Sequence, residues 1–161
     1  MNSKIVFLDI DGVICVYPEY QFNWIGNEND RLSGLCCKYL KEILDTTQAK
    51  IVITSSWRLS EKNSADLYRQ LEKHGIAKDY IIGQTASLSS DKNIKTHNEL
   101  RWFEIKDYIE KNGITDYIIL DDFNLDKYDK PHLVKTKKHT GITEKLKEVC
   151  IEKLSRKSSQ Q

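Results

Sequence analysis

The segment Lys4-Ile-Val-Phe-Leu-Asp-Ile-Asp-Gly-Val13 decides the fold, because a short apolar run in it ends in two aspartates and a glycine. Runs of similar form follow at residues 50–54, 79–83 and 116–121, and a weaker one at 132–135. Short runs rich in Ile and Val that do not alternate with polar residues are typical of strands buried on both faces of a parallel sheet. The sequence therefore predicts a mainly parallel sheet of about five strands.

Amphipathic helical patterns lie between these runs. Ser60 is expected to cap the start of the second predicted helix, and Gly75 and Gly113 are expected to end the second and the third. Either Thr140 or Thr143 caps the fourth. Strands that alternate with such helices indicate βαβ units and a doubly wound, Rossmann-like α/β fold. The expected apolar stripes are Leu35, Tyr39, Leu40, Ile43 and Leu44; Leu67 and Leu71; Trp102, Ile105 and Ile109; and Ile142, Leu146, Val149 and Cys150.

The composition fits one globular domain. The chain has 161 residues, of which 39% are hydrophobic and 30% charged, so we expect a single domain over residues 1–154 and a polar tail over 155–161. A formal net charge of +1 argues against attraction of the whole surface to nucleic acid or to an anionic membrane. No apolar run is long enough for a transmembrane helix or a signal peptide. The four cysteines lack CxxC spacing, so we expect a reduced, cytoplasmic protein without membrane insertion, and nothing indicates an obligate partner.

Carboxylates and hydroxyls follow three of the predicted strands, at the edge where open α/β sheets bind their ligands. Carboxylates that converge there repel one another unless a cation neutralises them. Hard oxygen donors without a soft ligand nearby suit Mg²⁺. The sequence therefore predicts an Mg²⁺ site at this edge. Its candidate ligands are Asp9, Asp11, Asp121 and Asp122, and the hydroxyls beside them belong to Thr54 and Ser55.

Three segments contain these carboxylates and hydroxyls: Phe7-Leu-Asp-Ile-Asp-Gly-Val13, Ile53-Thr-Ser-Ser-Trp-Arg58 and Ile118-Ile-Leu-Asp-Asp122. In this order they resemble the first, second and fourth motifs of the haloacid dehalogenase-like (HAD) superfamily. Arg101 stands where a basic third motif is expected, at the start of the helix before the last of these runs. With the late Thr-Gly-Ile-Thr143, these pieces are also similar to the small HAD domains of "Swiss army knife" RNA-repair proteins. The likeness covers nearly the whole chain.

The resemblance implies roles for the four aspartates. Asp9 would be the nucleophile that attacks phosphorus and forms an aspartyl-phosphate. Asp11 would protonate the leaving oxygen and then act as base for the hydrolytic water. Asp9, the backbone carbonyl of Asp11 and Asp121 would hold Mg²⁺, with Asp122 close behind.

The resemblance also implies groups that bind the phosphoryl oxygens. The hydroxyl of the second motif is either Thr54 or Ser55. The basic group is Arg101, which stands where Lys is usual, or else Lys95. Arg58 is either a second phosphate contact or a solvated arginine at a helix start.

The spacing between the motifs leaves no room for a cap domain, which HAD enzymes of small metabolites usually carry. A helix takes the later part of residues 12–53, and a helix and a strand take most of 59–100. The remaining segment Val13–Ser33 either stacks on a base or a phosphotyrosine ring or covers an edge of the core. Its aromatic residues are Tyr17, Tyr20, Phe22 and Trp24.

The sequence thus predicts an Mg²⁺-dependent phosphomonoesterase of the capless HAD type. An open site suits a phosphorylated macromolecule, either a phosphotyrosine protein or a nucleic-acid end. The alternative is a phosphate-binding or signalling module with the same fold and little turnover. The motif order argues against a response-regulator receiver, in which the acidic pair comes first and the phosphorylated aspartate lies on the third strand.

Overall fold

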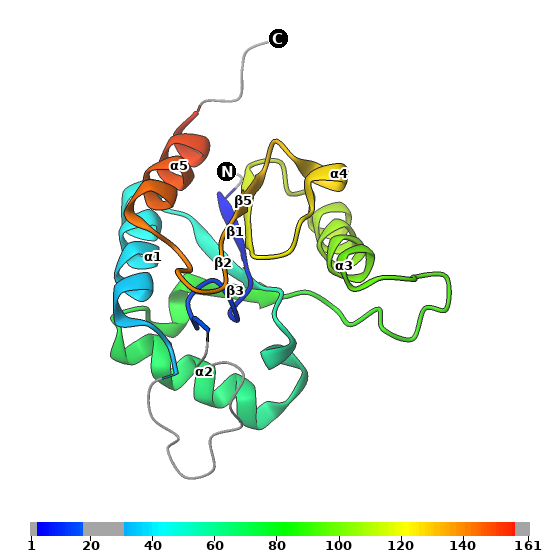
Figure 1. Ribbon diagram of the computed structural model, residues 1–161, viewed down its shortest axis with the longest axis horizontal. Coiled ribbons are helices and arrows are strands. Elements are labelled where there is room, and N and C mark those ends of the chain that lie inside the picture. The colour runs from blue at the N-terminus through cyan, green and yellow to red at the C-terminus, as the bar shows by residue number, and fades with distance from the viewer. Residues whose placement is uncertain (1–2, 18–30, 157–161) are drawn as a thin grey trace.

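A parallel sheet lies at the centre of the protein (Figure 1). The computed structural model describes residues 3–17 and 31–156. In strand order β3-β2-β1-β4-β5, each described neighbouring pair is parallel. The predicted α/β class and parallel sheet are therefore confirmed. The strands are β1 (Ile5–Leu8), β2 (Lys50–Ile53), β3 (Ile81–Gln84), β4 (Tyr117–Asp121) and β5 (Leu133–Lys135).

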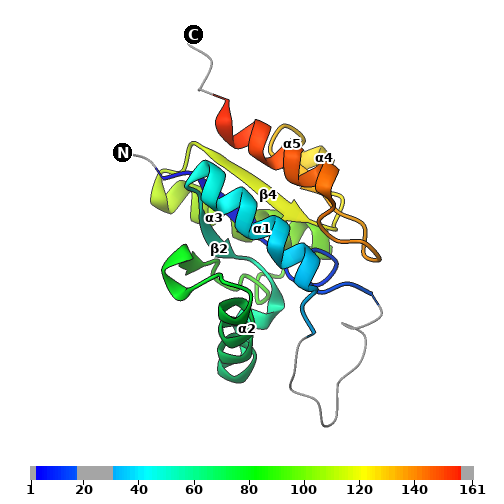
Figure 2. The same ribbon diagram turned by 90° about the vertical axis from the view of Figure 1, so that its left-hand side faces the viewer.

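Helices cover both faces of the sheet, as a doubly wound fold requires. Leu40, Leu71 and Leu154, from α1, α2 and α5, belong to the cluster on one face, and Ile105 of α3 belongs to the cluster on the other. Figures 1 and 2 show α1 and α5 side by side, with α3 and α4 across the sheet from them. The helices are α1 (Gly34–Thr47), α2 (Glu61–Lys73), α3 (His97–Asn112), α4 (Asp126–Asp129) and α5 (Glu144–Ser155), with short 3₁₀ helices η2 (Ser56–Leu59) and η3 (Lys78–Tyr80).

The central strand β1 is buried on both faces. Val6 and Leu8 pack toward α1 and α5, whereas Ile5 and Phe7 pack toward α3, and all four side chains are inaccessible to solvent. Alternate residues of a strand point to opposite faces, so a strand between two helical layers has no polar position. This is the physical reason for the uninterrupted apolar run at the start of the chain.

The helix boundaries agree with four of the predicted caps. The Ser60 hydroxyl accepts a hydrogen bond from the Asn63 amide at 3.1 Å, and Gly113 ends α3 with a φ of 61°. Gly75 ends α2 in the same way, with a φ of 80°. Thr143 accepts from the Leu146 amide at 3.2 Å, which decides between the two candidates for the last cap.

Two details of the predicted helices were wrong. Ile142 is buried but precedes α5. Leu35 is 57% exposed, because the face of α1 that meets the sheet carries Cys36 and Cys37 instead.

The described residues contain no cap domain. The segment 59–100 holds α2, η3, β3 and the loop that leads to α3. Tyr20, Phe22 and Trp24 of the predicted aromatic segment lie outside the described residues, and so does the end of the predicted tail, 157–161. No helix in the described part of the chain is both long enough and apolar enough to cross a membrane.

Candidate active site

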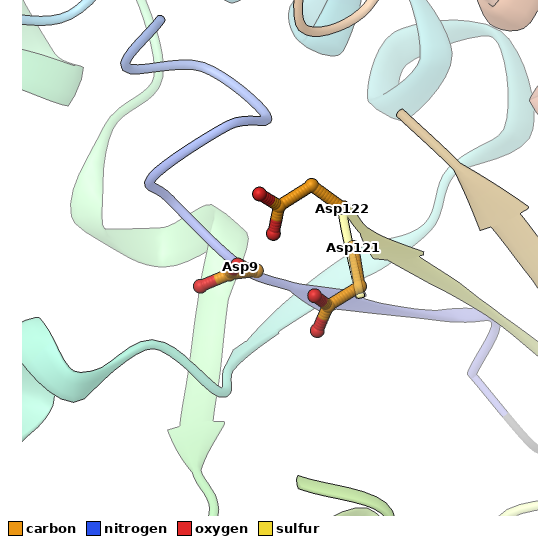
Figure 3. A group of neighbouring side chains, drawn as sticks. All are labelled: Asp9, Asp121 and Asp122. Carbon is orange, nitrogen blue, oxygen red and sulfur yellow. The ribbon is translucent and has the colours of Figure 1, made fainter. Parts of the chain in front are cut away.

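Three carboxylates meet at the carboxyl edge of the sheet (Figure 3). Asp9 follows β1, Asp121 ends β4, and Asp122 comes next. One oxygen of each lies within 4.8 Å of the others, and Asp9 and Asp121 are almost completely buried. β1 and β4 are neighbours at the point where the strand order reverses, which is the usual ligand site of an open α/β sheet. One cation could therefore contact all three carboxylates.

Gly12 allows Asp122 to approach the first motif. Its φ is +81°, which favours glycine, and a Cβ at this position would lie 2.4 Å from an oxygen of Asp122. The Thr136 hydroxyl donates to the carbonyl of Gly12 at 2.6 Å, which fixes the turn. The glycine of the motif is thus required by both the backbone and the neighbouring carboxylate.

Asp11 lies near these three carboxylates, but its own carboxylate is not part of the group that could hold a cation. The indole N–H of Trp57 donates to its Oδ1 at 3.2 Å. Burial, reinforced by the charge of Asp9, raises the pKa of Asp11 to about 6, against the opposing effects of Trp57 and Arg31. The carboxyl group therefore holds a proton more readily than an exposed aspartate does.

Arg101 is the cation that the structure brings to the carboxylates. Its Nη1 donates to Oδ2 of Asp121 and lies 3.3 Å from Oδ2 of Asp9. Burial would lower the pKa of Arg101, but the charges of Asp9 and Asp121 outweigh burial and raise it. Lys95 instead donates to the carbonyl of Lys92 at 3.0 Å, so the geometry favours Arg101 as the basic group.

Arg101 does not remove the electrostatic repulsion among the three carboxylates. Burial and the charge of Asp9 raise the pKa of Asp121 well above its usual value, although Arg101 opposes the rise. The same two causes raise the pKa of Asp122 to about 6. One guanidinium does not neutralise three carboxylates, of which Asp9 and Asp121 are buried. The donor set therefore fits a hard divalent cation.

A buried hydroxyl at the end of β2 has no partner. Thr54 is inaccessible to solvent, and its Oγ1 makes no hydrogen bond to any described residue. Ser55 instead uses its Oγ to accept from the Trp57 amide at 3.2 Å, which caps η2. Because an unpaired buried hydroxyl is costly, the geometry favours Thr54 over Ser55 as the hydroxyl that is available to bind a ligand. The sequence did not single out Thr85, a second buried hydroxyl without a described partner, which follows β3.

Arg58 is neither solvated nor directed at the carboxylates. Its Nη2 pairs with Glu104 of α3 at 2.8 Å, and both side chains are 4% exposed. The remaining donors go to backbone carbonyls at the ends of β2 and β3: those of Thr54, Ser55, Thr85 and Ala86. The geometry therefore favours neither of the two predicted roles, and Arg58 joins the ends of two strands to α3.

The comparison with known families agrees with the motifs. Residues 5–146 match the family described as the HAD domain in Swiss Army Knife RNA repair proteins. The chain belongs to this family. Membership supports a HAD-type phosphatase in general, and Mg²⁺ is the cation that HAD enzymes generally use. No curated protein and no solved structure matches the chain.

The substitution Gly12→Ala tests how closely the Asp122 side chain packs against the first motif of this HAD domain. Gly12→Ala is expected to lower the free energy of unfolding by about 3 kcal/mol, because strain and a collision add. Gly113→Ala is the matched control, since its φ is also positive but no atom lies within 4 Å of the added Cβ. It should lose only about 1 kcal/mol. Equal losses in urea denaturation would show that Asp122 moves aside freely.

Removal of the Glu104 charge tests the buried ion pair of Arg58 and Glu104. Glu104→Gln is expected to cost about 3 kcal/mol in urea denaturation, because it leaves the Arg58 guanidinium buried without its counter-charge. Glu110→Gln removes an exposed partner of Lys106 from the same helix and should cost less than about 1 kcal/mol. Similar losses for the two variants would contradict the structural role assigned to Glu104.

Proposed function

We propose that this protein is an Mg²⁺-dependent phosphomonoesterase that acts through an aspartyl-phosphate on Asp9. The observation that carries the proposal is the convergence of Asp9, Asp121 and Asp122 within 4.8 Å, with Arg101 against two of them. The three carboxylates would hold Mg²⁺, which would offset the negative charge of the phosphoryl oxygens. The predicted contact from the Asp11 backbone carbonyl remains part of this proposal.

The chemistry needs two carboxyl groups in different protonation states. Asp9 attacks phosphorus as a carboxylate, the bond from phosphorus to the leaving oxygen breaks, and Asp11 gives that oxygen its proton. In the second half, Asp11 takes a proton from water as the water oxygen attacks phosphorus. The bond between phosphorus and Asp9 then breaks, which releases phosphate and restores Asp9. The raised pKa of Asp11 supports its role as the acid.

Two further groups would hold the phosphoryl oxygens. Thr54 offers a buried hydroxyl that makes no hydrogen bond to the described residues. Arg101 offers a guanidinium already held beside Asp9. A permanent charge and a positioned donor stabilise the transition state without reorganisation during the reaction.

The substrate we propose is a phosphate on a macromolecule. The described residues form no cap over the carboxylates, so bulk attached to the phosphate has room at the carboxyl edge. The family name refers to RNA repair proteins, which supports a nucleic-acid end over a phosphotyrosine protein.

Hydrolysis of p-nitrophenyl phosphate tests the metal and the nucleophile. We expect activity that requires Mg²⁺ and disappears in EDTA, and Asp9→Asn should lower kcat by at least about 1,000-fold. Asp79→Asn, the same change at an exposed position in η3, should retain wild-type activity. Full activity of Asp9→Asn would contradict the mechanism. Phosphate binding without turnover in the wild type would favour a binding or signalling module.

The leaving group tests the role of Asp11. Asp11→Asn should slow hydrolysis of an alkyl phosphate by about 100-fold or more, since an alkoxide must be protonated as it leaves. The loss with p-nitrophenyl phosphate should be smaller in the first half-reaction, because nitrophenolate leaves without a proton. This difference is measured in single-turnover release of the alcohol. Equal losses for both substrates would show that Asp11 is not the acid.

A further inference from the structure

Arg31 lies near Asp11, the residue proposed to protonate the leaving oxygen. Its guanidinium carbon is 4.1 Å from the centre of the Trp57 ring, and the N–H of that ring donates to Asp11. A single indole thus separates the Arg31 cation from the proposed acid. The charge of Arg31 is felt at Asp11, where it opposes the rise of the carboxyl pKa.

Among the described residues, Arg31 is paired only loosely with a carboxylate. Its nearest described carboxylate is Asp66, whose Oδ2 lies 3.8 Å from Nη2 of Arg31. Asp66 already accepts from Arg69 at 2.6 Å and from Gln70 at 2.8 Å. The Arg31 side chain is 24% exposed, so part of it is accessible to a ligand while the Trp57 ring lies against the guanidinium.

We propose that Arg31 determines specificity by binding a second anionic phosphate, carried by the leaving group of the substrate. This inference rests on the proposed function, because it takes Asp11 as the group that protonates the leaving oxygen. A guanidinium offers parallel N–H donors to two oxygens of one phosphate. The substrate class is then a phosphomonoester at the end of a nucleic-acid strand, whose nearest phosphodiester supplies the second anion. A phosphotyrosine ring carries no charge at that place.

A comparison of two dinucleotides measures the contribution of the second phosphate's charge. Both carry the same terminal phosphomonoester, at the 5′ or the 3′ end, but one has an ordinary phosphodiester linkage and the other a neutral methylphosphonate. We expect the wild type to prefer the charged linkage by about tenfold in kcat/KM. Arg31→Gln should reduce this ratio to about one or two.

Arg69→Gln is the matched control. Arg69 also pairs with Asp66 and carries the same charge, but its side chain is 40% exposed, whereas the guanidinium that lies over the Trp57 ring belongs to Arg31. This variant should keep the preference of about tenfold. An unchanged ratio in Arg31→Gln, or no preference in the wild type, overturns the inference.

Binding measurements distinguish a failure of this inference from a failure of the proposed function. In Asp9→Asn, which should bind without turnover, the Kd ratio of the two dinucleotides is measured with and without Arg31→Gln. If the wild type hydrolyses no phosphomonoester, the proposed function fails, and the Kd ratio still decides the role of Arg31. Tighter binding of a phosphotyrosine peptide than of the charged dinucleotide would overturn the inference and indicate a protein substrate.

Discussion

The mutual repulsion of Asp9, Asp121 and Asp122 is the constraint on which the arrangement of the site depends. The parallel pairing of β1 with β4 brings these carboxylates together, since the Asp9 amide donates to the Leu120 carbonyl at 3.0 Å. A buried apolar strand such as β1 resists displacement, so the carboxylates cannot separate. Arg101 offsets part of the charge, and a divalent cation would offset the rest.

The helix α3 connects this charged edge with the carboxyl ends of β2 and β3. Arg101 reaches the carboxylates, and Glu104, less than one turn later, holds Arg58. Arg58 in turn binds carbonyls of Thr54 and Thr85. The buried pair therefore fixes the end of β2, with its unpartnered hydroxyl, relative to the arginine that would bind the same phosphoryl group. A network of this kind rigidifies a site when its donors and acceptors are satisfied.

The strands and the carboxylate cluster could be predicted because their signals are local. An apolar run such as Ile5–Leu8 reports burial on both faces, and the carboxyl ends of parallel strands necessarily share one edge. The pairing of Arg58 with Glu104 could not be predicted, since the two residues lie far apart in sequence and only packing brings them together. Leu35 was wrongly placed in the core, although Leu40 and Leu44 of the same stripe are buried, because Cys36 takes the buried position at the start of α1. Trp57 gave no signal of its contact with Asp11, since the two residues also lie far apart in the sequence.

Thermal unfolding of Asp122→Asn and of the wild type at pH 8, with and without Mg²⁺, tests whether the three carboxylates repel one another and share a cation. We expect the difference in Tm between the variant and the wild type to change sign between the two conditions. In EDTA the variant should have a higher Tm than the wild type, because one of three repelling charges is gone. In Mg²⁺ the wild type should gain stability through binding, whereas the variant should gain little. A variant that is less stable than the wild type by the same amount in both conditions would show that the carboxylates neither repel nor share a cation.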